Sequence, residues 1–123
     1  EYAARGGVPN EVVPLNNENS REKANFTGKK GNDRYEYTAP VRSFDANPFG
    51  LYDMSGNVWE FVSDFYAENY FAGAPKVDPK GPESGKDHVV RGGSWDSDPN
   101  KHLRISFRRP WGAGNIVGFR CAM

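Results

Sequence analysis

Cysteine and histidine are scarce in this sequence. The 123 residues contain one cysteine, Cys121, and two histidines, His88 and His102. One cysteine excludes an internal disulfide, and two histidines outside any recognisable motif are too few for a dependable metal site or catalytic triad. The enzyme classes built on these side chains therefore find no support in the composition.

Net charge and long apolar runs are lacking as well. Lysine plus arginine and aspartate plus glutamate both number 16, so no net field attracts nucleic acid or an anionic membrane. No apolar run approaches the roughly 20 residues of a membrane span. We therefore expect neither nucleic acid among the partners nor a membrane span in the chain.

Glycine, proline and aromatic residues are abundant instead. There are 14 Gly, 9 Pro, 8 Phe, 6 Tyr and 3 Trp, whereas hydrophobic residues make up only 37% of the chain. Such a composition predicts few long periodic segments and a core of aromatic rings packed between turns. The fold class expected is α+β or mainly β with little regular secondary structure, and the length suits one domain covering residues 1–123.

Short regular elements are expected at both ends and in the middle. Glu1 to Arg5 has the composition of a helix end that Gly6 and Gly7 stop. Because this helix has no cap at residue 1, we expect a domain incomplete at its N-terminus, or one that a second chain completes. Four stretches have strand-like composition, at residues 35–44, 58–66, 88–95 and 115–121.

Two further expectations concern burial and surface. In the last of these strands, Ile116, Phe119 and Cys121 are expected to point into the interior. Residues 8–30 and 66–86 are rich in polar residues, glycine and proline, which predicts irregular surface segments.

The stretch from Asn47 to Asp64 carries the clearest chemical pattern. Asp53 and Glu60 lie on either side of a kink around Gly56. Two carboxylates that flank a glycine turn can converge on one point, beside the carbonyl oxygens of the turn, which is the ligand set of calcium. The alternative is a helix cap with solvated acidic side chains.

Three motifs carry a family resemblance. Residues 47–64, the Arg-Gly-Gly-Ser-Trp sequence at 91–95 and the Gly-Phe-Arg-Cys-Ala sequence at 118–122 resemble the formylglycine-generating enzyme, or sulfatase-modifying factor, family. The resemblance extends over residues 1–123. It implies the C-type-lectin-like sulfatase-modifying-factor fold, of which this chain would form the C-terminal portion.

The resemblance implies a first calcium site near the N-terminal loop. The matching ligands are the side chains of Asn25 and Asp33 with the carbonyl oxygens of Phe26 and Tyr35. Mixed amide, carboxylate and carbonyl oxygens suit a hard cation. The alternative at this place is an ordinary loop held by Asx turns.

A second calcium site is implied at the kink. Its ligands would be the side chains of Asp53 and Glu60 with the carbonyl oxygens of Gly56 and Val58. The family more often has Asn at the position of Asp53, and the added charge should not weaken calcium binding. One or two calcium ions are therefore expected as cofactors. Calcium sites favour an extracytoplasmic or secreted location, although the sequence does not identify the compartment.

The catalytic metal of the family lacks its ligands in this chain. Catalytic members oxidise a substrate cysteine to formylglycine with copper(I), which two cysteine thiolates hold three and eight residues after the serine that matches Ser94. Those positions are Ser97 and His102, and copper(I) demands soft ligands. Trp59 and Ser94 match the oxygen pocket, although a core tryptophan is the commoner fate of such a residue. We expect neither copper nor a catalytic residue in this degenerate pocket.

A candidate ligand-binding face follows the glycine pair. Residues 96–114 combine acids, arginines and an aromatic, a mixture that can grip a peptide or glycan but also occurs in ordinary charged loops. The residues assigned to this face are Trp95, Asp96, Asp98, Arg104, Arg108 and Trp111.

Three functional hypotheses remain. The first is a non-catalytic, calcium-stabilised module that binds a protein, peptide or small-molecule ligand. The second is a fragment or subunit of a formylglycine-generating-type oxidoreductase whose active residues lie partly upstream. The third is a retroelement-diversified variable binding protein. The variable stretch of such proteins is typically rich in asparagine, and here only Asn100 and Asn115 occur between the glycine motifs.

Overall fold

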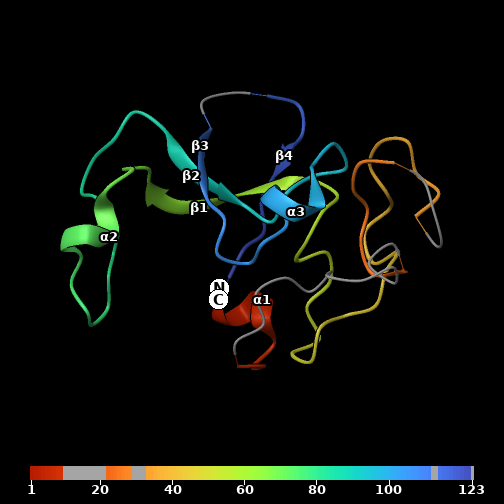
Figure 1. The fold of residues 1–123 in the computed structure, drawn as a ribbon, viewed down its shortest axis with the longest axis horizontal. Coiled ribbons are helices and arrows are strands. Elements are labelled where there is room, and N and C mark those ends of the chain that lie inside the picture. The colour runs from red at the N-terminus through yellow and green to blue at the C-terminus, as the bar shows by residue number, and fades with distance from the viewer. Residues whose placement is uncertain (10–21, 29–32, 112–113, 123) are drawn as a thin grey trace.

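The computed structural model describes residues 1–9, 22–28, 33–111 and 114–122, and Figure 1 shows its course. The regular elements are short. They are α1 (Tyr2–Arg5), β1 (Trp59–Phe65), α2 (Tyr70–Gly73), β2 (His88–Arg91), α3 (Pro99–His102), β3 (Arg109–Trp111) and β4 (Val117–Gly118). The expected α+β class with little regular structure is confirmed. None of the helices in the described ranges is long and apolar enough to cross a membrane.

One small mixed sheet organises the molecule. Its strand order is β3-β2-β1-β4, with β1 antiparallel to β2, β2 antiparallel to β3, and β4 parallel to β1. The register pairs Glu60 of β1 with Arg91 of β2 on one side and with Gly118 of β4 on the other. The sheet therefore places the end of β4 beside Glu60, a residue nearly 60 positions earlier in the chain.

The N-terminal helix ends as expected. Gly6 adopts φ +60°, a left-handed conformation that glycine takes at no steric cost, and its N–H donates to the carbonyl of Ala3 at 3.2 Å. A Cβ at Gly6 would approach the Cδ of Pro48 to 2.5 Å. Both the turn and the close contact with the segment at Pro48 therefore require glycine.

The predicted strand over residues 35–44 is wrong. The chain there runs through turns and bends, and Arg42 has φ +65°. Within this segment the backbone pairs with a side chain instead of with a neighbouring strand. Ala39 donates its N–H to Asn57 Oδ1 at 2.9 Å, and its carbonyl accepts from Asn57 Nδ2 at 3.2 Å. Pro40, the next residue, has no N–H to offer a ladder.

The other strand predictions are confirmed in part. Strands form at Trp59–Phe65 and His88–Arg91, inside the expected ranges, but the closing strand shrinks to Val117–Gly118. The interior placement of Phe119 and Cys121 is wrong, since Phe119 is 79% exposed and Cys121 is exposed. Pairing with β1 stops at Gly118, so these side chains have no sheet face to cover. Ile116 is half-buried.

The segment at residues 96–114 contributes to the core as well as to the surface. Leu103 and Ile105 are buried, and Leu103 packs with Ala24 and Phe26 in one apolar cluster. The segment also supplies β3, which we did not predict. This packing joins the loop at residues 24–26 to the turn after α3.

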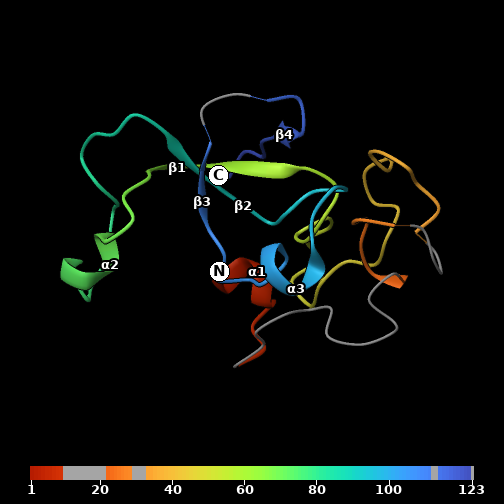
Figure 2. The same ribbon diagram turned by 45° about the horizontal axis from the view of Figure 1, so that its top comes forward.

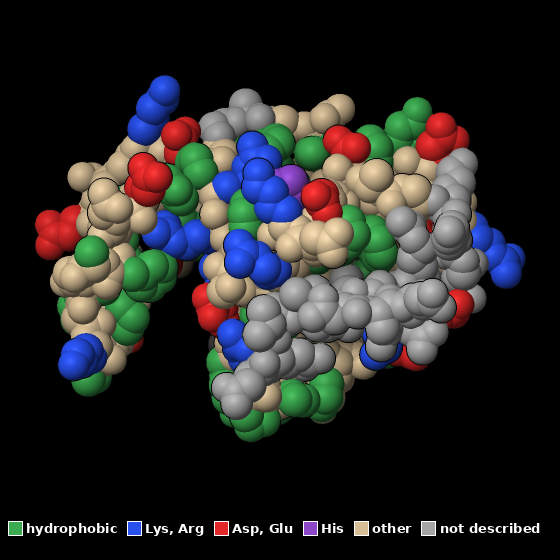
Figure 3. Space-filling view, viewed as in Figure 1, with side chains coloured by type: hydrophobic (Ala, Val, Ile, Leu, Met, Phe, Trp, Pro, Cys, Tyr) green, Lys and Arg blue, Asp and Glu red, His purple; other side chains and the backbone are tan. Residues whose placement is uncertain are grey.

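Residues 66–87, here called the arm, leave the sheet after β1 and carry α2. Figures 1 and 2 show α2 beyond the end of β1, apart from α1 and α3. A cavity of about 290 Å³ lies between the arm and the sheet, and Figure 3 shows a hollow between them. Arg108 holds the arm by donating to the carbonyls of Ala67 at 2.9 Å and Glu68 at 3.0 Å.

Candidate functional site

The fold brings Asn25, Phe26 and Asp33 together in the interior. Asn25 and Asp33 are each only 1% exposed, and the N–H of Phe26 donates to Asp33 Oδ2 at 3.1 Å. The Asn25 amide nitrogen donates to the carbonyl of Tyr37 at 2.7 Å and to Asn57 Oδ1 at 3.4 Å. Because both of these neighbours are acceptors, the NH₂ group of Asn25 must face them.

The amide oxygen of Asn25 then points elsewhere. It is buried and has no hydrogen-bond donor among the described residues. A buried polar atom of this kind is rare and costs free energy unless another group satisfies it. A buried amide oxygen and a buried carboxylate that bonds the N–H of the following residue, Phe26, are donor types that fit calcium. The carbonyl oxygens of Phe26 and Tyr35 remain predicted ligands.

In residues 1–9, 22–28, 33–111 and 114–122, no three His, Cys, Asp or Glu side chains come together in a group that could hold a metal ion. The two predicted calcium sites each rely on two side chains and two main-chain carbonyl oxygens, and they remain predictions.

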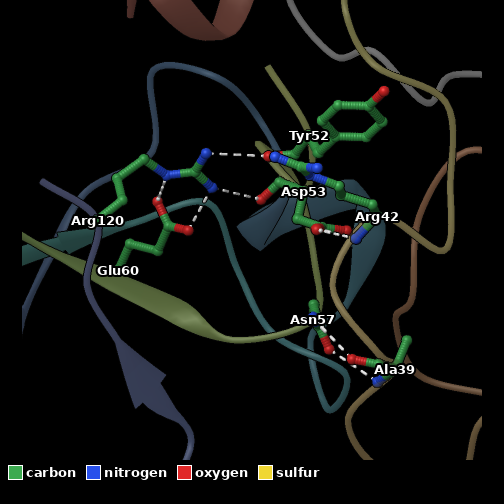
Figure 4. A network of polar contacts seen from close by, with 7 residues as sticks. All are labelled: Ala39, Arg42, Tyr52, Asp53, Asn57, Glu60 and Arg120. Carbon is green, nitrogen blue, oxygen red and sulfur yellow. Dashed lines mark hydrogen bonds and ion pairs between the residues drawn. The ribbon is translucent and has the colours of Figure 1, made fainter. Parts of the chain in front are cut away.

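Asn57 connects the two candidate metal regions, and the sequence reasoning missed it. Its side chain is 7% exposed and bonds the backbone of Ala39, as Figure 4 shows. Its own N–H donates to the carbonyl of Asn25 at 2.8 Å, and its carbonyl accepts from the N–H of Trp95 at 2.8 Å. A polar residue next to a glycine kink and before an apolar strand was the available signal.

Gly56, the residue before Asn57, lies very close to the main chain of Asn25. It has φ +79°, and a Cβ there would lie 2.2 Å from the carbonyl oxygen of Asn25. Only glycine allows the kink to approach the Asn25 backbone so closely.

The second predicted set also shares one cavity. Asp53, Gly56, Val58 and Glu60 all line a space of about 360 Å³ at the surface. Both carboxylates, however, already have partners (Figure 4). Asp53 Oδ2 accepts the N–H of Arg42 at 2.8 Å, and the Glu60 carboxylate pairs with the Arg120 guanidinium.

Arg120 is the second residue that sequence reasoning missed. Its Nε donates to Glu60 Oε2 at 2.6 Å, and one amino group donates to the other carboxylate oxygen. The guanidinium also donates to the carbonyls of Tyr52 at 3.0 Å and Asp53 at 3.2 Å. The hydrogen bond with Glu60 raises the pKa of Arg120. The only sequence signal was its place in the Gly-Phe-Arg motif.

The residues that the family resemblance assigned to a degenerate copper pocket pack against one another and against neighbouring side chains. Ser94 and Ser97 are buried, their hydroxyl oxygens lie 3.1 Å apart, and the Ser94 N–H donates to Ser97 Oγ at 2.8 Å. The ring of His102 lies edge-on to Trp59, with centroids 5.8 Å apart, and close to Phe107 at 5.1 Å.

Burial and the nearby cations Lys101 and Arg109 lower the pKa of His102. The neutral imidazole is therefore favoured in this aromatic setting. Trp59 itself is 2% exposed, so its ring lies in the interior.

The six residues of the candidate ligand-binding face have separate positions. Asp98 caps α3 by accepting from the N–H of Asn100 at 2.9 Å. Arg108 holds the arm, and its guanidinium lies over the ring of Phe71. Among the described residues, no hydrogen bond, ion pair or ring contact joins two of the six. The other members lie as follows: the Trp95 ring contacts the Tyr37 ring, the Trp111 ring lies against the Arg109 guanidinium, Arg104 donates to the main-chain carbonyl of Lys101, and Asp96 is exposed.

Comparison with known proteins adds relatives and a fold match. A formylglycine-generating enzyme from Streptomyces coelicolor is 37% identical over 137 residues, which cover 99% of this chain and 43% of that protein. A Mus musculus protein, the inactive C-alpha-formylglycine-generating enzyme 2, is 33% identical and matches 99% of this chain and 40% of its own length. This chain thus spans less than half of these relatives.

The fold is shared with a solved structure. Treponema denticola variable protein 1 superposes with a TM-score of 0.78 at 30% identity, covering 96% of this chain and 42% of that one. The C-type-lectin-like sulfatase-modifying-factor fold expected from the motifs is consistent with this match. The model of the sulfatase-modifying factor enzyme 1-like domain matches residues 1–123. The chain therefore belongs to the sulfatase-modifying factor enzyme 1-like domain family.

Proposed function

We propose that this chain is a non-catalytic, calcium-stabilised module of its family that binds a protein or small-molecule ligand. The observation that carries the proposal is the pair Ser97 and His102 at the positions of the family's copper thiolates. A hydroxyl and an imidazole are not the soft ligands that copper(I) requires. Ser97 is hydrogen-bonded to Ser94, and His102 is packed against Trp59, so both side chains have roles that need no metal.

The remaining cysteine does not repair the pocket. Cys121 is the only cysteine in the sequence, and one thiol cannot supply two thiolate ligands. It is also exposed, outside the buried Ser94–Ser97 region. A mouse relative that is named inactive agrees with loss of activity within this family.

The amide oxygen of Asn25, which has no donor among the described residues, and the buried carboxylate of Asp33 support the structural part of the proposal. A calcium ion would take these two groups as ligands. It would join the loop at residues 24–26 to the residues around Asp33. Because Phe26 packs against Leu103, this link would also hold the turn after α3.

The test of catalysis is direct. The protein is incubated with a cysteine-containing sulfatase-type peptide, copper(I) and oxygen, and the peptide is analysed by mass spectrometry. A formylglycine-generating enzyme serves as positive control, and circular dichroism shows that the sample is folded. We expect no conversion of cysteine to the aldehyde, and conversion would overturn the non-catalytic assignment.

A second candidate function follows from the length of the relatives. Because this chain spans 43% of the Streptomyces coelicolor enzyme, it would also suit a fragment or subunit of a larger oxidoreductase. Adding the upstream half of a family member in trans would then restore turnover of the same peptide. Absence of turnover with a stable complex formed would count against this alternative.

The match to Treponema denticola variable protein 1 favours a third reading, a variable binding protein. Here the ligand would bind some of the six residues predicted for that role, which have separate positions in the fold: Trp95, Asp96, Asp98, Arg104, Arg108 and Trp111. A reverse transcriptase and template repeat beside the gene would support this reading.

A further inference from the structure

The cavity at the glycine kink already contains a cation of the chain itself. The Arg120 guanidinium donates to both carboxylate oxygens of Glu60 and to the carbonyls of Tyr52 and Asp53. Figure 4 shows the guanidinium between Glu60 on one side and the turn at Tyr52 and Asp53 on the other. One positive group thus receives four oxygens from two separate segments.

This oxygen set is of the kind that calcium uses. A carboxylate that offers both oxygens, together with main-chain carbonyls, is a recurrent calcium environment. Glu60 carries one negative charge and Arg120 one positive charge, so the pair is neutral as it stands. A calcium ion placed at Glu60 would meet a guanidinium at contact distance, and this repulsion disfavours its entry.

The second carboxylate of the cavity, that of Asp53, has a different partner. Asp53 has φ +54°, an uncommon conformation for a residue other than glycine. Its carbonyl oxygen accepts from Arg120, while its carboxylate accepts the N–H of Arg42 at 2.8 Å. The two acidic groups that a metal site at the kink would need are therefore bound to different partners, Asp53 to the Arg42 N–H and Glu60 to Arg120.

We propose that Arg120 is the resident cation of this cavity and that a divalent cation binds there only when Arg120 is removed. In the chain as it stands, Glu60 is thus a partner of an arginine and not a metal ligand. Arg120 ties the segment after β4 to β1 and to the turn before the kink, which is the structural link that a bound ion would otherwise supply.

The experiment counts calcium ions bound per chain. Isothermal titration and equilibrium dialysis with calcium up to about 1 mM, the weak end of protein calcium sites, are applied to four proteins. They are the wild type, Arg120→Met, Glu60→Gln and the control Lys76→Met, which removes one exposed cation outside the cavity.

The expected result is one additional calcium ion in Arg120→Met compared with the wild type, and no change in the control. Glu60→Gln is expected to leave the count unchanged, which tests the proposal even if Arg120→Met does not fold. A count that falls by one in Glu60→Gln, or a folded Arg120→Met with no additional ion, would overturn it. Failure of the Asn25 and Asp33 site would appear separately, as a wild type that binds no ion.

Discussion

Replacement of Asp33 by asparagine tests whether calcium stabilises this fold. The side chain is 1% exposed and receives the N–H of Phe26 at 3.1 Å, a bond that the asparagine oxygen can also accept. The substitution therefore keeps the shape and this hydrogen bond and removes one negative charge. Its main effect should be on affinity for a cation.

The size of the effect follows from linkage. A ligand present at about 100 times its dissociation constant stabilises the folded state by about 2.7 kcal/mol. At about 4 °C per kcal/mol for a domain of this size, this corresponds to a melting temperature about 10 °C higher in calcium than in chelator. Asp33→Asn should lose most of this increment.

The assay is thermal unfolding, followed by circular dichroism in calcium and in excess chelator. The matched control is Asp78→Asn, which removes a carboxylate whose side chain is 79% exposed and paired only with an exposed lysine. We expect a calcium increment in the wild type and the control, and a much smaller one in Asp33→Asn. Equal melting temperatures of the wild type in calcium and in chelator would refute the reasoning.

Three further predictions concern the kink, the degenerate pocket and the arm. Gly56→Ala should destabilise by more than about 2 kcal/mol in denaturant unfolding, because it adds a Cβ 2.2 Å from a carbonyl oxygen to the cost of a positive φ. Gly50 also has a positive φ, +75°, but open space around it, so Gly50→Ala should cost only the backbone strain of about 1 kcal/mol. Equal losses of stability in the two variants would contradict a clash with the carbonyl oxygen of Asn25. His102 should titrate by NMR below its ordinary pKa of 6.5, because burial and nearby cations favour the neutral ring. Because His102 then binds a proton more readily in the unfolded chain, the contribution of its neutral ring to stability is complete above pH 6.5 and is lost as the pH falls. His102→Gln should flatten this pH dependence of stability, and an NMR midpoint above 6.5 would contradict the prediction. Arg108→Ala should increase proteolysis within residues 66–87 at least several-fold, because two hydrogen bonds from a charged group to the arm are lost, whereas unchanged cleavage would show that other contacts hold it.

Local signals in the sequence were sufficient for several elements. The stop of α1 depends on Gly6, and the end of β2 on the glycine pair that follows it, so neighbouring residues decide both. The strand at Trp59–Phe65 is likewise visible as a short run of β-forming residues. The family assignment rested on three such motifs, and the match over residues 1–123 confirms it.

Other predictions failed because distant residues decide them. The segment at 35–44 alternates like a strand, yet the side chain of Asn57, 18 residues from Ala39, takes its backbone groups. Phe119 is apolar and aromatic like many core residues, but it is exposed because the parallel pairing of β4 with β1 ends one residue before it. In neither case does the local pattern contain the partner that determines the outcome.

The candidate site divides in the same way. The sequence alone determined which ligand atoms exist: one thiol, two imidazoles, and oxygens arranged around a glycine kink, because the identity of each side-chain group does not depend on folding. Only the tertiary structure decided how these atoms are used. Among the described residues, it left the amide oxygen of Asn25 buried without a donor, and it joined Arg120 to Glu60 across 60 residues. Which acidic side chain Arg120 meets depends on which strands lie side by side. In the sheet order β3-β2-β1-β4, β4 lies beside β1, and this pairing joins residues that are far apart in the chain.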